Sequence, residues 1–179
     1  LEFNEGLTIV YGRNGSGKST LARKLAERLD LRFVELDDLS WEPGWREAPL
    51  ELFQHRVRQA TAGDAWVVAG SYRRVRDLFW PRAELIVLLD YPFPVVFWRL
   101  LTRTFRRAAR AELCCNGNRE RLLPHFYSRD SLLWWCIKTY RPRRREFDRL
   151  EQPGQCPARV LRLTTTWATE RWLARLSAR

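Results

Sequence analysis

The sequence predicts a three-layer α/β domain whose central sheet contains five parallel strands. Short apolar segments alternate along the chain with longer amphipathic segments, which is typical of repeated strand–helix units. The apolar segments are nearly continuous, as expected for strands that are covered on both faces. A glycine-rich stretch at residues 12–20 follows the first of these strands. A length of 179 residues fits one such domain, 1–179, with a sizeable core.

The glycine-rich stretch joins the first predicted strand, residues 7–11, to the first predicted helix, residues 19–29. It fits the pattern G-x-x-x-x-G-K-[ST], in which glycines let successive backbone N–H groups face a polyphosphate. A glycine-rich turn that binds nothing is the alternative, but strand, loop and helix all agree with the binding pattern. We expect the phosphates to contact Gly12, Arg13, Asn14, Gly15, Ser16, Gly17, Lys18, Ser19 and Thr20.

Two side chains of this stretch carry the expected chemistry. Lys18 can reach the β- and γ-phosphates, and the Ser19 hydroxyl can ligate Mg²⁺. The positive end of the following helix adds to the attraction for phosphate. The expected cofactors are therefore Mg²⁺ and ATP or GTP, between which the sequence does not choose.

The second predicted strand, residues 31–36, ends in the acidic pair Asp37 and Asp38. Ligands of open α/β sheets gather at the carboxyl ends of the strands, so this pair falls where chemistry is expected. Asp37 is the candidate to hold the metal or to accept a proton from an acceptor, and Asp38 is a second acceptor-side candidate. The alternative for one of the two is an N-cap of a short helix.

Residues beyond the second and third strands are candidates for the acceptor site. Trp41 and Trp45 flank a Pro-Gly turn and could line a pocket, although tryptophan is more often simply packed. The third predicted strand, 65–69, is followed by a glycine that permits close approach of a ligand. The predicted acceptor-side set here is Trp41, Gly70, Tyr72 and Arg76.

A fourth strand, 85–89, precedes a predicted helix at 94–109 that carries a basic stripe. Arg99, Arg103 and Arg107 are spaced i, i+4 and i+8, so they project from one face and repel one another unless an anion lies between them. A solvated basic face is the alternative. We favour a lid at about 106–128 that clamps transferring phosphates, with Arg103 and Arg107 as catalytic candidates and Arg119 on the acceptor side.

A second basic feature, besides the arginine stripe, follows a predicted helix at 131–140. It consists of Arg141, Pro142, Arg143, Arg144 and Arg145. This cluster is the best candidate for a nucleic-acid contact, and a solvated helix end is an equally good interpretation. The remaining expected elements are a fifth strand at 159–163 and a helix at 169–176.

Net charge, cysteine content and the lengths of apolar stretches restrict the class of protein and the partners that we expect. The formal net charge is +11, and an arginine-dominated excess suits bidentate phosphate contacts but is weak support for a nucleic-acid partner. Cys114, Cys115, Cys136 and Cys156 have no metal-site spacing, so we expect free thiols and no zinc. Without a signal peptide or an apolar stretch of membrane-spanning length, we expect a cytoplasmic protein with no membrane partner; the oligomeric state stays open.

Several of these motifs occur together in one known group. They are residues 15–22, 36–37, 66–68, 89–92, 117–120 and 131–134, with Trp41, Trp45, Gly70, Tyr72 and the arginine stripe at 99–107. As a set they resemble the nucleoside monophosphate kinase-like group of P-loop NTPases, and within it the bacterial DNA topology modulation proteins, which are adenylate kinase-like. The similarity covers residues 7–173.

The resemblance implies a P-loop NTPase sheet of order 2-3-1-4-5, a small arginine-bearing helical lid and an acceptor site near Asp37, Gly70 and Tyr72. The loop at 164–166 would help to hold the nucleotide base. One position departs from the group: Ala69 stands where a carboxylate usually orders the water shell of Mg²⁺. Asp37 or Asp38 would then replace it, or catalysis would be weak or lost.

Three functions compete at this stage. The first is an ATP-dependent phosphotransferase for a nucleotide or another small hydroxyl or phosphate acceptor, in which Lys18, Asp37, Arg103 and Arg107 act on the transferring group. The second is a nucleotide-gated nucleic-acid-binding ATPase that uses the cluster at 141–145. The third is a kinase for nucleic-acid 5′ ends. We rank the small-acceptor kinase first, because a single-helix lid suits a compact substrate.

Overall fold

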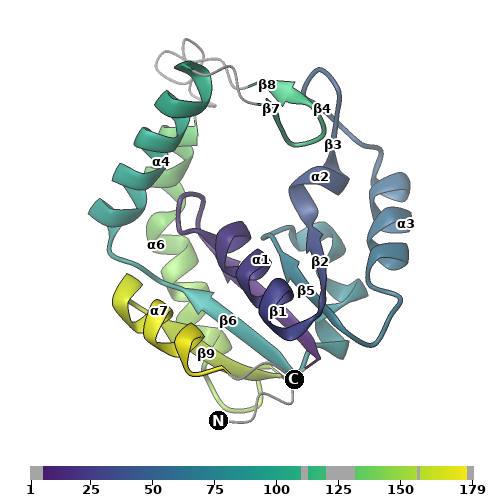
Figure 1. Cartoon of the computed structure of the whole chain (residues 1–179), viewed down its shortest axis with the longest axis vertical. Coiled ribbons are helices and arrows are strands. Elements are labelled where there is room, and N and C mark those ends of the chain that lie inside the picture. Colours follow the sequence, from purple (N-terminus) through teal and green to yellow (C-terminus); the bar gives the residue numbers. More distant parts are fainter. Residues whose placement is uncertain (1–5, 110–112, 120–131, 157, 177–179) are drawn as a thin grey trace.

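The computed structural model describes residues 6–109, 113–119, 132–156 and 158–176. Its centre is a five-stranded parallel sheet in the order β2-β5-β1-β6-β9 (Figure 1). Counted among the strands of this sheet alone, the order is 2-3-1-4-5, so the predicted fold class is confirmed. The bounds are β1 Leu7–Gly12, β2 Arg32–Glu35, β5 Trp66–Ala69, β6 Leu85–Leu89 and β9 Arg159–Leu163.

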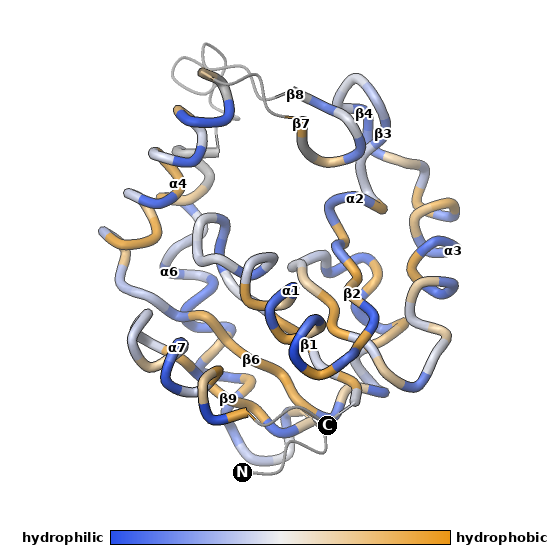
Figure 2. Tube along the Cα trace, viewed as in Figure 1, coloured by the Kyte–Doolittle hydropathy of each residue, from blue (hydrophilic) through white to orange (hydrophobic). Residues whose placement is uncertain are grey.

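The central strands β1, β5 and β6 are largely apolar, and β6 is coloured as hydrophobic along its length in Figure 2. Successive side chains of these strands enter two different cores. On β6, Leu85, Val87 and Leu89 belong to one core, whereas Ile86 and Leu88 belong to the other. All five of these side chains are fully buried. The sheet is therefore the middle layer of three, as the continuous apolar runs predict.

The two cores are covered by different helices. The first is formed with α1 Lys18–Leu29, α4 Phe93–Ala109 and α7 Thr166–Ala174, and the second with α3 Leu50–Ala60 and the short segments η1 Arg73–Leu78 and η2 Trp80–Arg82. Helix α6, Leu132–Leu150, contributes to both cores, through Cys136 to the first and Phe147 to the second. Figure 1 shows α4 and α6 side by side, and they are in contact.

Between β2 and α3 the chain forms a short helix and a hairpin. The helix α2, Leu36–Ser40, includes Asp37 and Asp38 in its first turn. The irregular turn that we expected at 41–45 is a hairpin of β3 Trp41–Glu42 and β4 Arg46–Glu47. A second hairpin, β7 Leu113–Cys114 and β8 Asn118–Arg119, lies beside it (Figure 1).

The predicted end of the helix at residue 140 is wrong, because α6 continues through Pro142 to Leu150. Proline usually ends or bends a helix, but here burial of Phe147 and Leu150 in the second core holds the next turns in place. The basic cluster at 141–145 therefore lies inside a helix and not at its end.

The predicted lid at 106–128 is described only in part. Residues 106–109 belong to α4 and residues 113–119 form the second hairpin, whereas 110–112 and 120–128 lie outside the described residues. None of the helices that the structure describes has the length and apolar character needed to span a membrane.

Candidate active site

The main cavity, of about 1360 Å³, opens at the carboxyl ends of the strands. The glycine-rich loop, α2, η1, α4, α6, α7 and the second hairpin all contribute to its walls. A parallel sheet offers its ligand site at this edge, because the loops that leave the strands converge there. The sequence placed the phosphate loop, the acidic pair and the arginine stripe separately, and the fold brings all three to this cavity.

The glycine-rich loop is shaped by its glycines. Gly15 and Gly17 have φ angles of 84° and 91°, and Gly17 is the N-cap of α1. A Cβ on Gly15 would lie 2.6 Å from the carbonyl oxygen of Val96 on α4, so the loop requires glycine at this point to pack on that helix. The Ser16 hydroxyl is buried and has no hydrogen-bond partner in the described part of the chain, as expected for a group that faces a ligand.

The side chain of Lys18 is hydrogen-bonded to the backbone of the glycine-rich loop. Its Nζ donates to the carbonyl oxygen of Arg13 at 3.0 Å. Burial lowers the pKa of Lys18 to about 8, and the negative charges of Asp37 and Glu35 oppose this shift. The positive charges of Arg103 and Arg143 lower the pKa further, which shows that cations from α4 and α6 act on the same site.

Glu35, at the end of β2, is a site residue that the sequence reasoning missed. The Ser19 side chain lowers the pKa of the Glu35 carboxyl, and Oε1 of Glu35 is buried without a hydrogen-bond partner among the described residues. Burial is the larger effect and raises the pKa of Glu35 to about 7, and the charge of Asp37 also raises it. The available signal was a carboxylate in the predicted strand at 31–36, two residues before Asp37.

Asp37 lies next to a tyrosine in the wall of the cavity. The Tyr72 hydroxyl donates to Asp37 Oδ1 at 2.7 Å, and the Tyr72 ring packs edge-on against Phe53. Burial raises the pKa of Tyr72, and the neighbouring Asp37 charge raises it further. Burial, then the Asp37 charge, also raises the pKa of Asp38. The predicted acceptor residues Asp37, Asp38 and Tyr72 therefore lie together.

Gly70 allows this arrangement. Its φ angle is 146°, and a Cβ there would lie 2.7 Å from Cβ of Leu36, at the start of α2. The glycine therefore permits α2 to sit against the end of β5, which brings Asp37 and Tyr72 within hydrogen-bond distance.

The two hairpins are joined by asparagine side chains. Buried Asn118 accepts from the Trp45 backbone N–H at 2.9 Å and donates to the carbonyl oxygens of Glu42 at 2.9 Å and Cys115 at 2.7 Å. Asn116 donates to the carbonyl oxygen of Trp41 at 3.1 Å. The rings of Trp41 and Trp45 meet edge to face, and both line the cavity. No local sequence pattern indicates this contact between distant segments.

Arginines of α4 and α6 form another part of the cavity wall. Arg99, Arg103 and Arg107 of the predicted stripe line it from α4, and Arg106 joins them. From α6, Arg143 donates to the Tyr11 hydroxyl and to Glu146 Oε2, the latter at 3.0 Å. The cluster at 141–145 is therefore divided, because Arg143 faces the cavity whereas Arg141, Arg144 and Arg145 are exposed.

Three predicted site residues are placed differently from the rest. The side chain of Arg13 is buried away from the cavity against Asp90, so only its backbone remains available to a phosphate. Arg76 lies beside the cavity, with its guanidinium 3.4 Å from the centre of the Trp80 ring and an ion pair to Glu146. Arg119 is in β8, but its side chain lies outside the described residues.

The end of the cavity beside α1 has a different lining. The Tyr91 hydroxyl is hydrogen-bonded to the Thr169 hydroxyl at 2.7 Å, and the Arg99 guanidinium lies 5.4 Å from the Tyr91 ring centre. Lys24 and Glu170 form an ion pair at 3.0 Å next to them. Thr166, from the loop that the resemblance assigns to the nucleotide base, also lines this end.

The donor set suits a metal that is held chiefly by phosphates. Within the described ranges, no three His, Cys, Asp or Glu side chains are grouped closely enough to hold a metal ion. Ser19, Glu35 and Asp37 lie together at the foot of the loop, and the partnerless Oε1 of Glu35 offers an acceptor for metal-bound water. Such a sparse oxygen set fits Mg²⁺, which keeps several waters and binds substrate phosphates.

Comparisons with known proteins agree with this geometry. Residues 14–60 match the sequence pattern of the shikimate kinase family, whereas no curated protein matches the chain. A gluconokinase from Sinorhizobium meliloti 1021 is 21% identical, with a TM-score of 0.52 over 95% of this chain and 92% of its own. A shikimate kinase from Acinetobacter baumannii, solved with shikimate, is 18% identical, with a TM-score of 0.53 over 94% and 88%. A sugar kinase from a Janibacter species is 20% identical, with a TM-score of 0.52 over 93% and 91%.

The chain has the fold of P-loop kinases and carries the glycine-rich phosphate-loop pattern. Its structural neighbours are small-molecule kinases, and they share its fold at low sequence identity. The match to the shikimate kinase pattern begins within the phosphate loop and covers α1, β2, α2, the hairpin of β3 and β4, and α3. Lys18, Glu35 and Asp37 lie in these segments.

Proposed function

We propose that the protein transfers the γ-phosphoryl group of ATP or GTP, with Mg²⁺, to a small acceptor bound beside Asp37. The observation that carries this proposal is one cavity in which Lys18, the Ser19–Glu35 pair and the Tyr72–Asp37 pair meet arginines from α4 and α6. Phosphoryl transfer depends mostly on positioning and on neutralising charge, and this set of side chains supplies both.

The loop would bind the triphosphate through backbone N–H groups and the N-terminus of α1. Lys18 would exchange its contact with the Arg13 carbonyl for the β- and γ-phosphates. Ser19 and Asp37 would hold the metal, and Glu35 would order its water shell in place of the carboxylate that Ala69 lacks. When bound, Mg²⁺ supplies charge neutralisation between the β- and γ-oxygens.

Asp37 would orient the acceptor and accept its proton. The hydrogen bond from Tyr72 fixes one carboxylate oxygen and leaves the other available to the acceptor. Arg103 and Arg107 would stabilise the charge on the transferring group, and Arg143 would do so from the other side. Trp41, Gly70 and Asp38 would shape the acceptor pocket.

The acceptor is expected to carry a negative charge of its own. More cations than carboxylates line the cavity, with Arg73, Arg74 and Arg143 on the acceptor side. The Acinetobacter neighbour was solved with shikimate, whose carboxylate is one example of such a group. Sugar acids, sugar phosphates and nucleotides are the classes to test first.

A coupled assay with ATP, Mg²⁺ and a panel of these acceptors tests the proposal. Turnover should require Lys18 and Asp37, so Lys18→Ala and Asp37→Asn should each lower it by about a hundredfold or more. Tight ATP binding without turnover on any acceptor class would refute the proposal.

A second function is favoured by one feature of α6. Lys138, Arg141, Arg145 and Arg149 recur along one face of the helix, are exposed and have no ion-pair partner among the described residues. Such a row suits the phosphate backbone of a nucleic acid, and it supports the finer resemblance to DNA topology modulation proteins. Binding of duplex DNA or RNA that weakens steeply with salt would establish this function, and phosphorylation of a 5′-hydroxyl oligonucleotide would join it to the first.

A further inference from the structure

The side chain of Arg13 leaves the phosphate loop and docks on α6. Its Nη1 forms an ion pair with Asp90 Oδ1 at 2.5 Å, and its Nη2 donates to the carbonyl oxygen of Tyr140 at 3.2 Å. The guanidinium also lies 4.0 Å from the centre of the Tyr140 ring. Only 3% of the Arg13 side chain is exposed, so this contact is a fixed part of the interior.

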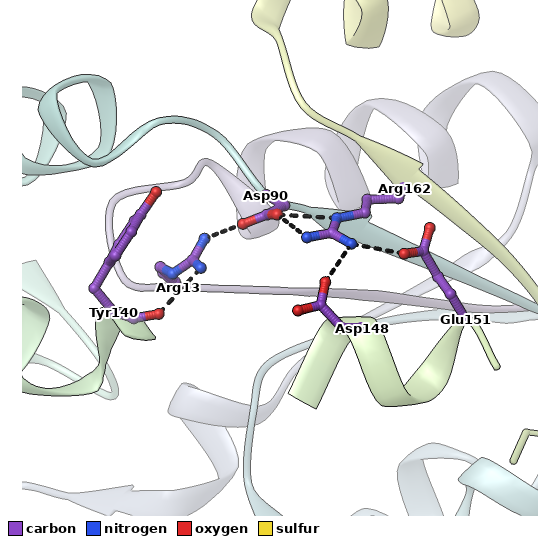
Figure 3. Close-up of polar contacts among 6 residues, drawn as sticks. All are labelled: Arg13, Asp90, Tyr140, Asp148, Glu151 and Arg162. Atoms are coloured by element: carbon purple, nitrogen blue, oxygen red, sulfur yellow. Dashed lines mark hydrogen bonds and ion pairs between the residues drawn. The ribbon is translucent and has the colours of Figure 1, made fainter. Parts of the chain in front are cut away.

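Asp90, just after β6, is shared by a second arginine (Figure 3). Arg162 Nε on β9 donates to Asp90 Oδ2 at 2.9 Å. The same guanidinium donates to Asp148 at 2.8 Å and to Glu151 at 2.6 Å. The contacts therefore run from the loop through Asp90 and Arg162 to the end of α6, and they return to the loop through Tyr140.

These contacts hold α6 on both sides of its weakest point. Pro142 lacks the N–H that would bond to the preceding turn, and its ring crowds that turn, so the helix is weakened here. Tyr140 precedes this proline and Asp148 follows it. Arg143, the residue after the proline, is the arginine of the 141–145 cluster that lines the cavity.

We propose that Arg13, Asp90 and Arg162 form a brace that fixes α6, and with it Arg143, relative to the phosphate loop. Arg162 lies outside the walls of the main cavity, so it is a positioning residue that acts through Asp90 and α6. The brace joins the two sides of the site, because Arg13 is a loop residue and the brace contacts Tyr140 and Asp148 of the helix that carries Arg143. Its effect on catalysis rests on the proposed function, whereas its effect on structure does not.

Hydrogen exchange tests the structural part without any ligand. In Arg162→Gln, amides at 12–18 and 139–147 should exchange about tenfold faster, as expected from the loss of charge-assisted hydrogen bonds. Amides of α3 report global stability, and Asp64→Asn, which alters an exposed ion pair elsewhere, should change neither segment. Faster exchange confined to β9 and residues 148–151, or equal acceleration in α3, would overturn the proposal.

The double variant Asp148→Asn with Glu151→Gln provides a second test in case Arg162→Gln does not fold. It removes only the exposed contacts of Arg162 with α6 and leaves the buried pairs with Asp90 intact. Residues 139–147 should again exchange faster, by a smaller factor than in Arg162→Gln. Unchanged exchange in that segment would contradict the proposal.

A double-mutant cycle tests the catalytic part. Arg143→Ala is made in the natural chain and in Arg162→Gln, and kcat for phosphoryl transfer is measured in all four proteins. If the brace positions Arg143, the loss from Arg143→Ala should be about tenfold smaller in the Arg162→Gln background. If the loss of kcat in the double variant equals the product of the losses in the two single variants, the proposal is overturned. Absence of turnover in the natural chain would count against the proposed function, while the exchange experiment would still decide on the brace.

Discussion

Glu35 on β2 and Ala69 on β5 are partners in the parallel register of the sheet. Paired residues of neighbouring parallel strands face the same side, so the Glu35 carboxylate stands next to Ala69, the position at which the resemblance implies a carboxylate. The Ser19 side chain lowers the pKa of Glu35, so the two groups interact. We infer that Glu35 can supply from β2 the carboxylate that β5 lacks, and Ala69 does not by itself imply lost catalysis.

The first prediction removes the carboxylate at position 35 and then introduces one at position 69. Glu35→Gln should lower kcat by about tenfold to a hundredfold and raise the Mg²⁺ concentration needed for half-maximal rate, because the carboxylate that orders the metal waters is gone. Adding Ala69→Asp in the same chain should restore part of the rate. Glu51→Gln, on the exposed side of α3, is the matched control and should behave as the natural chain. A Glu35→Gln protein with normal Mg²⁺ dependence would exclude the role.

Glu35 should also affect stability in a pH-dependent way. Its pKa is raised from 4.5 to about 7 by burial, so its contribution to stability is complete below pH 4.5 and is lost as the pH rises through 7. Without nucleotide and Mg²⁺, Glu35→Gln should therefore be more stable than the natural chain at pH 8, by about 1 to 3 kcal/mol. Denaturant titrations should show this gain disappearing below pH 4.5.

The pair Tyr72–Asp37 should matter for the acceptor and not for the nucleotide. Tyr72→Phe keeps the ring against Phe53 but removes the 2.7 Å hydrogen bond to Asp37, and kcat should fall by about tenfold. The dissociation constant of ATP should stay unchanged. Tyr91→Phe removes a tyrosine hydroxyl at the other end of the cavity, so it should weaken ATP binding instead. If Tyr72→Phe weakened ATP binding and left kcat intact, the two ends would have been assigned wrongly.

Local pattern was sufficient to predict most of the fold. The segments 85–89 and 159–163 coincide with β6 and β9. The first is a continuous apolar run, and the second alternates Val and Leu with two arginines. The extension of α6 was not predictable in this way. Pro142 is a local signal to stop, and the burial of Phe147 that overrides it depends on a sheet far away in the sequence.

The site shows the same limit. A motif fixes the loop because its residues are neighbours in the chain, but it treats Arg13 as a variable position. That side chain owes its role to Asp90, 77 positions further along. Glu35 was overlooked because a charged residue in a strand usually faces solvent, and only the register with Ala69 shows where it points. Contacts of this kind come from the fold and not from spacing.

Asn118 should control the acceptor end of the cavity. Its amide makes three hydrogen bonds to backbone groups of both hairpins, so Asn118→Ala should free the Trp41–Trp45 hairpin. The KM for the acceptor should rise by about tenfold, with little change for ATP. Asn116→Ala removes a single hydrogen bond to that hairpin and should have a smaller effect in the same direction. An equal effect of the two variants would argue against the role of Asn118.

The last prediction concerns Asp90. Burial opposes its ionisation, but the hydrogen bonds from Arg13 and Arg162 outweigh it and lower the pKa of Asp90 below 3.8. Its stabilising contribution is therefore complete above pH 3.8 and is lost as the pH falls through the lowered pKa. Asp90→Asn leaves the buried Arg13 guanidinium without its anion and removes one of the three carboxylates that Arg162 contacts, so at pH 7 it should cost about 3 to 5 kcal/mol.

Acid should remove that difference. Once Asp90 of the natural chain is protonated, its carboxyl resembles the amide of the variant, and the two unfolding free energies should converge below pH 3.8. Urea titrations of both proteins between pH 7 and pH 3 measure the gap, with Asp64→Asn as the exposed-pair control. A gap that stays constant across this range would mean that the cost of Asp90→Asn comes from packing and not from the charge shared by the two arginines.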